Sequence, residues 1–181
     1  MHKHRPVTAE AALPRSVRLV ELPSTAMIAL LAGDLAGARK EVGVELTDYF
    51  LGDDAQWLWQ YRVDQLAADP SSVGWLVKVV VAEPDGVVVG HAGFHGPPDE
   101  SGMVEVGYSV DPAHRRQGYA RATLGALLER ASAEPDVRTV RASISPTNAV
   151  SLATIAGFGF LEVGEQWDER DGLELLFEVP V

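Results

Sequence analysis

The sequence predicts an α/β (α+β) domain built on one sheet of mixed strand direction. Three strand-like runs, at residues 75–82, 87–95 and 103–110, follow one another through turns, as in an antiparallel meander. A strand–helix–strand unit then spans residues 104–144, which predicts a right-handed parallel crossover. Strands that first meander and then alternate with helices are typical of such mixed sheets. The 181 residues suffice for one domain and its core.

The N-terminal part of the chain predicts a tail, a strand and a helix. Residues 1–15 mix basic residues, His and Pro without periodicity, so we expect a disordered tail before a single domain over residues 16–181. Loosely alternating apolar residues predict a first strand at residues 16–22. Ser24 is a favourable N-cap, and the helix that it begins is expected to run through Gly37.

Turn residues place the remaining elements. A helical apolar period covers residues 53–68, and Pro84-Asp85-Gly86 is strong hairpin chemistry. Asp111-Pro112 ends the third strand of the meander, and the clearest helix follows at residues 118–133 until Pro135 stops it. The last expected elements are a strand at 138–144, a helix at 148–156, and a closing hairpin with strands at 158–165 and 173–179.

Composition excludes several classes of function. The absence of cysteine excludes disulfides, thiolate metal sites and a cysteine nucleophile, and we expect no metal. No apolar run approaches the ~20 residues that span a bilayer. Residues 1–18 lack the apolar stretch of a secretory signal, so we expect a cytoplasmic protein without a membrane partner. A formal net charge of −11 argues against nucleic acid as a partner. The same charge is compatible with a cationic substrate, although solubility alone also explains it.

Residues 114–120, His-Arg-Arg-Gln-Gly-Tyr-Ala, place two arginines, a glycine and a small alanine at the predicted start of a helix. Unpaired N–H groups at a helix N-terminus carry the positive end of the helix dipole, and glycine lets the backbone approach an anion. Paired arginines add charge-assisted donors. The stretch therefore predicts a phosphate cradle, although an ordinary strand-to-helix turn with solvated arginines would use the same residues.

Four motifs in chain order resemble the GNAT superfamily of acyl-CoA-dependent N-acyltransferases. Arg115-x-x-Gly118-x-Ala120 matches the family's (Gln/Arg)-x-x-Gly-x-(Gly/Ala) signature, and residues 104–110 look like its fourth strand. Residues 144–151 and the run Gly157-Phe158-Gly159-Phe160 resemble its fifth strand, the following helix and the exit from that helix. The similarity is greatest to the Rim-type ribosomal-protein acetyltransferase branch and extends over residues 75–181.

The resemblance implies the GNAT fold, a mostly antiparallel sheet of about seven strands with helices on both faces. Its fourth and fifth strands are parallel and splay apart, and acetyl-CoA lies in the gap as a cosubstrate. The cradle would hold the pyrophosphate, and a backbone N–H of the fourth strand, beyond its bulge, would bind the thioester carbonyl. The implied cofactor-binding residues are Ser109, Val110, Arg115, Arg116, Gln117, Gly118, Tyr119, Ala120, Asn148 and Ser151.

Glu105 is the expected general base. It shares a strand face with Gly107 and Ser109. Partial burial raises the pKa of a carboxyl group toward the range that general-base catalysis requires, and glutamates at this position act as bases in several enzymes of the resembled family. An exposed or salt-bridged strand residue is the alternative. His91 and His95 are expected on the same face, diagonal to Glu105, where either is able to complete a proton relay.

The acid that protonates the leaving thiolate is harder to place. Many enzymes of the resembled family use a tyrosine on the helix after the fifth strand, but here that helix offers Ser151 and Thr154 instead. Ser151 is therefore the expected catalytic hydroxyl, although its own pKa suits the role poorly. Tyr108 and Tyr119 are substitutes by residue type, and Tyr119 is expected to pack at the helix start.

An acceptor pocket is expected between the N-terminal helices and the last hairpin. Its expected substrate-binding residues are Trp57, Tyr61, His95 and Trp167. Aromatic faces beside the acidic turn at residues 168–171 suit a cationic amine. Plain core packing of the aromatic residues and a solvated turn are the alternatives.

The predicted function is acetyl transfer from acetyl-CoA directly to a primary amine of a small molecule or a peptide N-terminus. A non-catalytic acyl-CoA-binding regulatory protein is the alternative, because it would keep the cradle and lack a working acid. A Rossmann nucleotide binder is disfavoured, since its glycine-rich turn follows the first strand of the sheet and this one follows the fourth. The identity of the amine and the choice between monomer and homodimer stay open.

Overall fold

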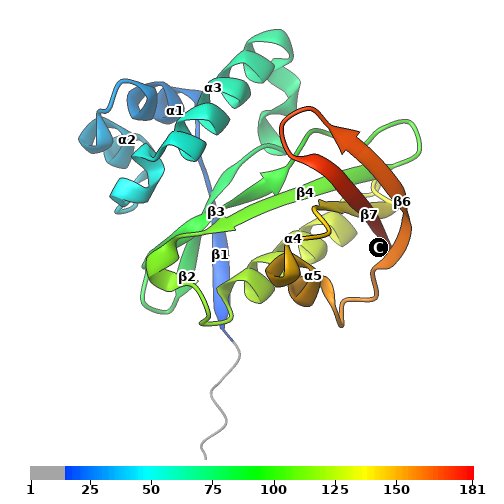
Figure 1. The fold of residues 1–181 in the computed structure, drawn as a ribbon. Helices are drawn as coiled ribbons and strands as arrows, with labels where there is room; N and C mark the ends of the chain where they lie inside the picture. The colour runs from blue at the N-terminus through cyan, green and yellow to red at the C-terminus, as the bar shows by residue number, and fades with distance from the viewer. Residues whose placement is uncertain (1–14) are drawn as a thin grey trace, which may run out of the picture.

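Among residues 15–181, which the computed structural model describes, seven strands form one sheet in the order β1-β2-β3-β4-β5-β7-β6 (Figure 1). β4 and β5 pair in parallel, and the other neighbouring pairs are antiparallel, which confirms the predicted mixed sheet. The tail expected at residues 1–15 lies, except for Arg15, outside the described residues. The strands are β1 (Ser16–Glu21), β2 (Lys78–Glu83), β3 (Val88–Phe94), β4 (Met103–Val110), β5 (Thr139–Ile144), β6 (Leu161–Asp168) and β7 (Gly172–Pro180).

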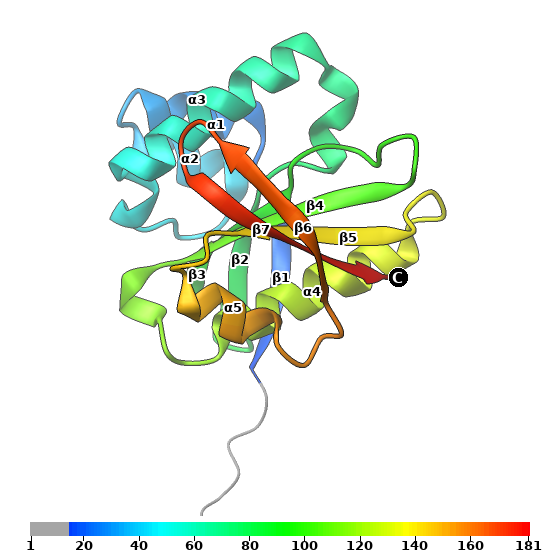
Figure 2. The same cartoon turned by 45° about the vertical axis from the view of Figure 1, so that its right-hand side comes forward.

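Helices cover both faces of this sheet (Figures 1 and 2). One core lies under α1–α3 and includes Val79 and Val81 of β2, whereas the other lies under α4 and includes Val80 and Ala82. Side chains alternate along a strand, so β2 contributes to both cores. Within residues 15–181, no helix combines the length and the apolar character that a membrane span requires. The helices are α1 (Ser24–Leu31), α2 (Leu35–Val42), α3 (Asp53–Ala68), α4 (Tyr119–Ala133) and α5 (Ala149–Ile155).

The single helix expected from Ser24 through Gly37 is two helices, and this corrects the prediction. α1 ends at Leu31, and Gly33 follows with a left-handed φ of 74° that favours glycine. Asp34 then caps α2, because its side chain accepts a hydrogen bond from the Gly37 N–H at 2.8 Å. Ser24 makes no capping hydrogen bond and is the first residue of α1.

The parallel contact between β4 and β5 is short. Its pairs run from Met103 with Thr139 to Glu105 with Arg141, whereas β4 stays paired with β3 as far as Val110. Beyond Glu105, β4 thus follows β3 alone and a gap opens toward β5. The bulge expected in β4 is a wrong prediction, since the β3–β4 register continues without a shift.

The ladder also decides which peptide groups face the gap. The His95 N–H donates to the Glu105 carbonyl at 2.8 Å, and the Asp111 N–H donates to the Val89 carbonyl at 2.9 Å. In an antiparallel pair, alternate residues point their peptide groups to opposite sides. The odd-numbered peptide groups of β4 therefore face β3, and those of Tyr108 and Val110 face the gap.

Candidate active site

Two cavities adjoin the gap between β4 and β5. The α4 cleft, of about 930 Å³, lies over the start of α4 and along α5. The hairpin cavity, of about 680 Å³, lies between α3, β4, β5 and the β6–β7 hairpin. Both are lined by Tyr108, Asn148 and Ser151, so these three residues mark the place where the cavities meet.

The loop before α4 has the backbone of an anion site. Arg116 and Gly118 both adopt left-handed conformations, with φ of 59° and 88°. Such turns direct successive N–H groups into a concavity that binds anions, and the first N–H groups of α4 have no partner within the helix. Two side chains hold the loop in place: Asp111 accepts from the Ala113 N–H at 2.9 Å, and Arg115 Nε donates to the Val110 carbonyl at 3.0 Å.

Nearly all of the residues expected to bind the cofactor line the α4 cleft. Gln117 does not, because its side chain turns back toward the Ala113 carbonyl at 3.4 Å. Tyr119 lines the cleft but is largely buried in the core, with the Arg15 guanidinium 5.2 Å above its ring. The lining residues among those expected are Ser109, Val110, Arg115, Arg116, Gly118, Tyr119, Ala120, Asn148 and Ser151.

The start of α5 is fixed by its own cap. The Asn148 side-chain oxygen accepts from the Ser151 N–H at 3.0 Å, which satisfies one of the free donors of the first turn. This bond leaves the Asn148 amide NH₂ as a donor for a ligand. Asn148 therefore serves as the predicted N-cap and also faces both cavities.

Tyr108 brings a buried hydroxyl to the junction of the cavities. Its Oη is shielded from solvent and makes no hydrogen bond of ordinary geometry among the described residues. Burial raises the pKa of Tyr108, while the nearby hydroxyls of Thr154 and Ser151 on α5 lower it in part. The Thr154 hydroxyl itself donates to the Val150 carbonyl at 2.8 Å.

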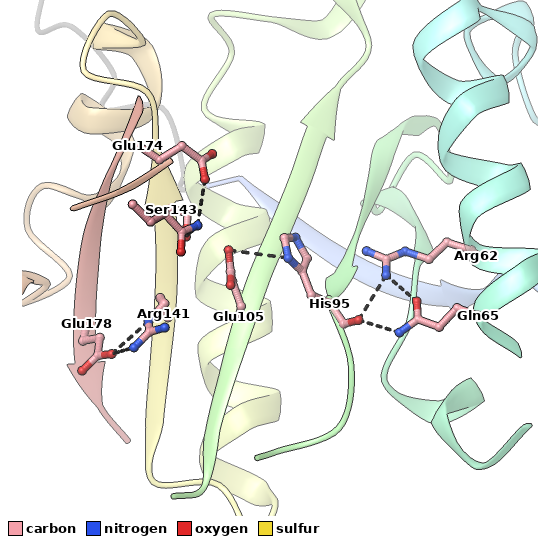
Figure 3. Close-up of polar contacts among 9 residues, drawn as sticks. Arg62, Gln65, His95, Glu105, Arg141, Ser143, Glu174 and Glu178 are labelled. Atoms are coloured by element: carbon pink, nitrogen blue, oxygen red, sulfur yellow. Dashed lines mark hydrogen bonds and ion pairs between the residues drawn. The ribbon is translucent and has the colours of Figure 1, made fainter. Parts of the chain in front are cut away.

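Glu105 and His95 form a pair that lines the hairpin cavity (Figure 3). His95 Nδ1 lies 3.5 Å from Glu105 Oε1. The two residues are directly opposite in the ladder, not diagonal as predicted. On α3, Arg62 Nη1 and Gln65 Nε2 donate to the His95 carbonyl at 3.1 and 2.8 Å, which fixes the end of β3.

The environment of His95 favours its neutral form. Burial lowers the pKa of His95, the Glu105 carboxylate raises it, and the Arg62 guanidinium lowers it further. The ring leans over Gly107, where an added Cβ would lie 2.9 Å from His95 Nε2. Glycine at position 107 therefore leaves room for a neutral imidazole ring beside Glu105.

His91 shares the sheet face of His95 but has a different role. It lies outside both cavities, and its ring stacks on Tyr49 at a centroid distance of 5.7 Å and meets Trp59 edge-on at 5.2 Å. Burial lowers the pKa of His91 to about 4, with a further contribution from the charge of Arg62. Of the two histidines considered for a proton relay, His95 alone therefore meets Glu105.

Carboxylates concentrate on the hairpin side of the gap. Glu174 of β7 accepts from Gln166 Nε2 at 3.0 Å, and Figure 3 shows Glu174 and Glu105 on either side of Ser143. Burial raises the pKa of Glu174, and the charges of Asp168, Glu105 and Asp171 raise it further. Glu174 is not among the site residues predicted from the sequence, although its alternation with Leu176 and Glu178 places it on this face.

Aromatic residues of α3 form one wall of the hairpin cavity. Trp57 and Tyr61 stack at a centroid distance of 5.4 Å and are 49% and 50% exposed, so they are surface residues and not core. The Arg170 guanidinium of the hairpin turn lies 3.8 Å above the Trp57 ring, and its Nη2 lies 3.0 Å from Asp54 Oδ1. These contacts join the hairpin to α3, as the approach of the two elements in Figures 1 and 2 illustrates.

Trp167 does not belong to this wall, which corrects the prediction. It is 77% exposed, and the cavity is lined by its neighbours Gln166 and Asp168 instead. Successive side chains of a strand point to opposite faces. Since Gln166 and Asp168 face the cavity, Trp167 between them faces away from it.

Comparison with known families gives a match that spans both β4 and the start of α4. A family model described as "Acetyltransferase (GNAT) domain" matches residues 40–161. The chain is also 29% identical over 124 residues to the uncharacterized N-acetyltransferase YjdG of Bacillus subtilis (strain 168), with 68% of this chain and 74% of that protein covered.

Solved structures share the fold at low sequence identity. A putative GNAT-family acetyltransferase from Bordetella pertussis is 21% identical with a TM-score of 0.60, over 97% of this chain and 99% of that one. Mycobacterium smegmatis RimJ in complex with CoA-disulfide is 20% identical with a TM-score of 0.59, over 93% and 88%. A spermidine N-acetyltransferase SpeG chimera from Vibrio cholerae is 13% identical with a TM-score of 0.62, over 92% and 95%.

Proposed function

This chain belongs to the acetyltransferase (GNAT) domain family and is an acyltransferase, and we propose that it transfers the acetyl group of acetyl-CoA directly to a primary amine. The proposal rests on one observation above all. The α4 cleft and the hairpin cavity meet at the gap beside β4, and the Glu105–His95 pair lines the hairpin side of that meeting point. A cofactor on one side and an amine on the other would have their reacting atoms brought together there.

The residues of the α4 cleft fit acetyl-CoA, which supplies an activated acetyl thioester when bound. The left-handed pair Arg116 and Gly118 offers N–H groups to a pyrophosphate, and the Asn148 amide offers a donor to the pantetheine arm. For the thioester carbonyl we propose the Val110 N–H, because the peptide group of Ser109 faces β3.

Glu105 is the proposed general base for the amine. Its carboxylate accepts a proton from the incoming ammonium. The neutral His95 beside it then passes this proton toward the open cavity. The Arg62 and Gln65 bonds to the His95 carbonyl hold this pair in register. The amine then reaches the gap in the deprotonated form that acyl transfer requires.

We propose that the acceptor carries a second positive charge. Five carboxylates and two guanidinium groups line the hairpin cavity. Burial raises the pKa of Glu174, and the neighbouring carboxylates raise it further. The stacked rings of Trp57 and Tyr61 add aromatic faces that attract cations. The SpeG structure is of a spermidine acetyltransferase and a further structure is of a ribosomal-protein-S5-alanine acetyltransferase, so related folds serve small and protein acceptors.

The test is release of free thiol from acetyl-CoA across a panel of acceptors. We expect release only in the presence of a primary amine, with higher kcat/KM for diamines and polyamines than for matched monoamines of equal length. Glu174→Gln should lower kcat/KM for diamines by about tenfold, since one charge contact of about 1.4 kcal/mol is lost, and should change the values for monoamines far less. Tight acetyl-CoA binding without turnover on polyamines, aminoglycosides, amino acids and peptides would favour the regulatory alternative.

A further inference from the structure

We propose that Tyr108 is the proton donor to the leaving sulfur, and that this acid is supplied from strand β4 and not from helix α5. The inference rests on the proposed acetyl transfer. Of the three residues that line both cavities, Asn148 has no acidic proton and its oxygen is engaged in the cap of α5. Ser151 has an alcohol hydroxyl, which is a far weaker acid than a phenol. Tyr108 is therefore the one acid of suitable strength at the junction.

The state of the Tyr108 hydroxyl points to a ligand. Its Oη is buried and unpaired among the described residues, although buried polar groups are nearly always hydrogen-bonded. An unsatisfied hydroxyl costs about 1–3 kcal/mol, so its position calls for a partner that arrives with the substrates. The hydroxyls of Ser151 and Thr154 lie close enough to influence its charge, and neither makes a well-aligned bond to it.

Strand geometry places this acid opposite the base. Glu105 and Tyr108 are three residues apart on β4, so their side chains leave the strand on opposite faces. Glu105 lines the hairpin cavity with His95, whereas Tyr108 packs with the core under α4 and α5. The amine is thus deprotonated on one face of β4, and the thiol is protonated on the other.

The proton inventory of the step balances. As the bond between the acetyl carbon and sulfur breaks, Tyr108 Oη gives its proton to the sulfur, which keeps the bonding electron pair. The ammonium first gives one proton to Glu105, which releases it to solvent through His95. The amine nitrogen then forms the new bond to the acetyl carbon and loses its second proton to Glu105. The Tyr108 phenolate regains a proton from solvent, and Glu105 again releases its proton to solvent through His95.

The test removes one oxygen atom. Tyr108→Phe should lower kcat by about 10²–10³, within the usual range for general acid–base catalysis, while thermal unfolding stays within a few degrees because the lost hydroxyl had no partner. Binding gives a readout that does not depend on turnover. Wild-type protein should bind CoA a few-fold more tightly than desulfo-CoA, and Tyr108→Phe should bind the two equally.

The same measurements on Ser151→Ala separate the two hydroxyls. We expect this variant to keep the preference for CoA over desulfo-CoA. Loss of the preference in Ser151→Ala, with Tyr108→Phe unchanged, would overturn the proposal. A kcat within threefold of wild type in Tyr108→Phe would do the same and leave acetyl transfer standing. Failure of the wild-type protein to acetylate any amine would instead remove the proposed function, and the desulfo-CoA comparison would still decide whether Tyr108 meets the sulfur.

Discussion

The two faces of strand β4 carry opposite environments on the same eight residues. On one face, Glu105 and Gly107 border an open cavity rich in carboxylates. On the other, Val104 and Val106 are buried under α4, and Tyr108 continues that row to the junction with α5. A proton acceptor needs access to solvent, and a phenolic donor needs an apolar setting that keeps it protonated. A strand supplies both within three residues because its side chains alternate.

The largest expected effect comes from the open face. Glu105→Gln keeps the shape of the side chain and removes its basicity, so kcat should fall by about 10²–10⁴. The affinity for acetyl-CoA should barely change, since Glu105 does not line the α4 cleft. Steady-state kinetics across pH, together with calorimetry, would check both statements.

Glu162→Gln on β6 is the matched control, because Glu162 is an exposed glutamate outside both cavities. It should leave kcat and its pH profile unaltered. A loss below tenfold in Glu105→Gln with an unchanged pH profile would reduce Glu105 to a residue that positions the substrate.

A second effect defines where the open face ends. His91 is on the same strand face as His95, but its folded pKa of about 4 lies below the ordinary value of 6.5. Between pH 6.5 and 4 the unfolded chain binds more protons, so wild-type stability should fall as the pH is lowered through this window, by about 3 kcal/mol in total. His91→Phe keeps an aromatic ring against Tyr49 and Trp59 and removes the pH-dependent contribution of His91 to the free energy of unfolding.

Denaturant unfolding of both proteins at pH 7 and pH 4.5 measures this contribution of His91 directly. The free energy of unfolding should drop by about 2–3 kcal/mol less in His91→Phe than in wild type between these two pH values. Equal drops in the two proteins would place a charged, solvated His91 on the open face and blur the contrast with His95.

The smallest effect should touch the α4 cleft alone. Gly118→Val forces a β-branched residue into a φ of 88°, which costs about 1–3 kcal/mol and disturbs the anion-binding turn. Acetyl-CoA affinity should fall by about 10- to 100-fold, which corresponds to a loss of about 1.4–2.7 kcal/mol of phosphate contacts. Calorimetry with CoA measures this change, and thermal unfolding measures the strain.

Gly43→Val provides a matched strain elsewhere. Gly43 has a φ of 75° at the end of α2, with open space around its Cβ position, and lies outside both cavities. This variant should lose similar stability and keep its acetyl-CoA affinity. If both variants bound CoA equally well, the turn at residues 116–118 would not be the phosphate cradle.

The sequence predicted the elements with strong periodicity and clear breaks. β4 at Met103–Val110 and α3 at Asp53–Ala68 have the predicted bounds, because Asp111-Pro112 and Asp69-Pro70 end them sharply. The long first helix was wrong, since the short repeat of Ala and Leu around Gly33 hides a break that Asp34 completes with its cap. The break itself has a local cause, because Gly33 adopts a left-handed φ and the Asp34 side chain caps the next helix.

Details of the site depended on tertiary geometry. The loop after β3 sets the register that brings His95 opposite Glu105, and Asp99 stabilises that loop by accepting from the Ser101 and Met103 N–H groups at 2.8 and 2.9 Å. Loop composition alone does not determine such a register. Similarly, the spacing of the aromatic residues on α3 did not reveal that Trp59 is the fully buried one.

The Arg170 guanidinium lies over the Trp57 ring, so a cation of the protein itself already occupies this aromatic face of the hairpin cavity. A cationic acceptor that stacks on Trp57 must first displace this guanidinium. The displaced Arg170 side chain then enters solvent or keeps its ion pair with Asp54. Binding at that ring is therefore an exchange of one cation for another, and the affinity reports the difference between two similar contacts. At the Trp57 ring, the site therefore discriminates less by the charge of the acceptor. It discriminates more by shape, and favours cations that fit the ring better than the Arg170 guanidinium does.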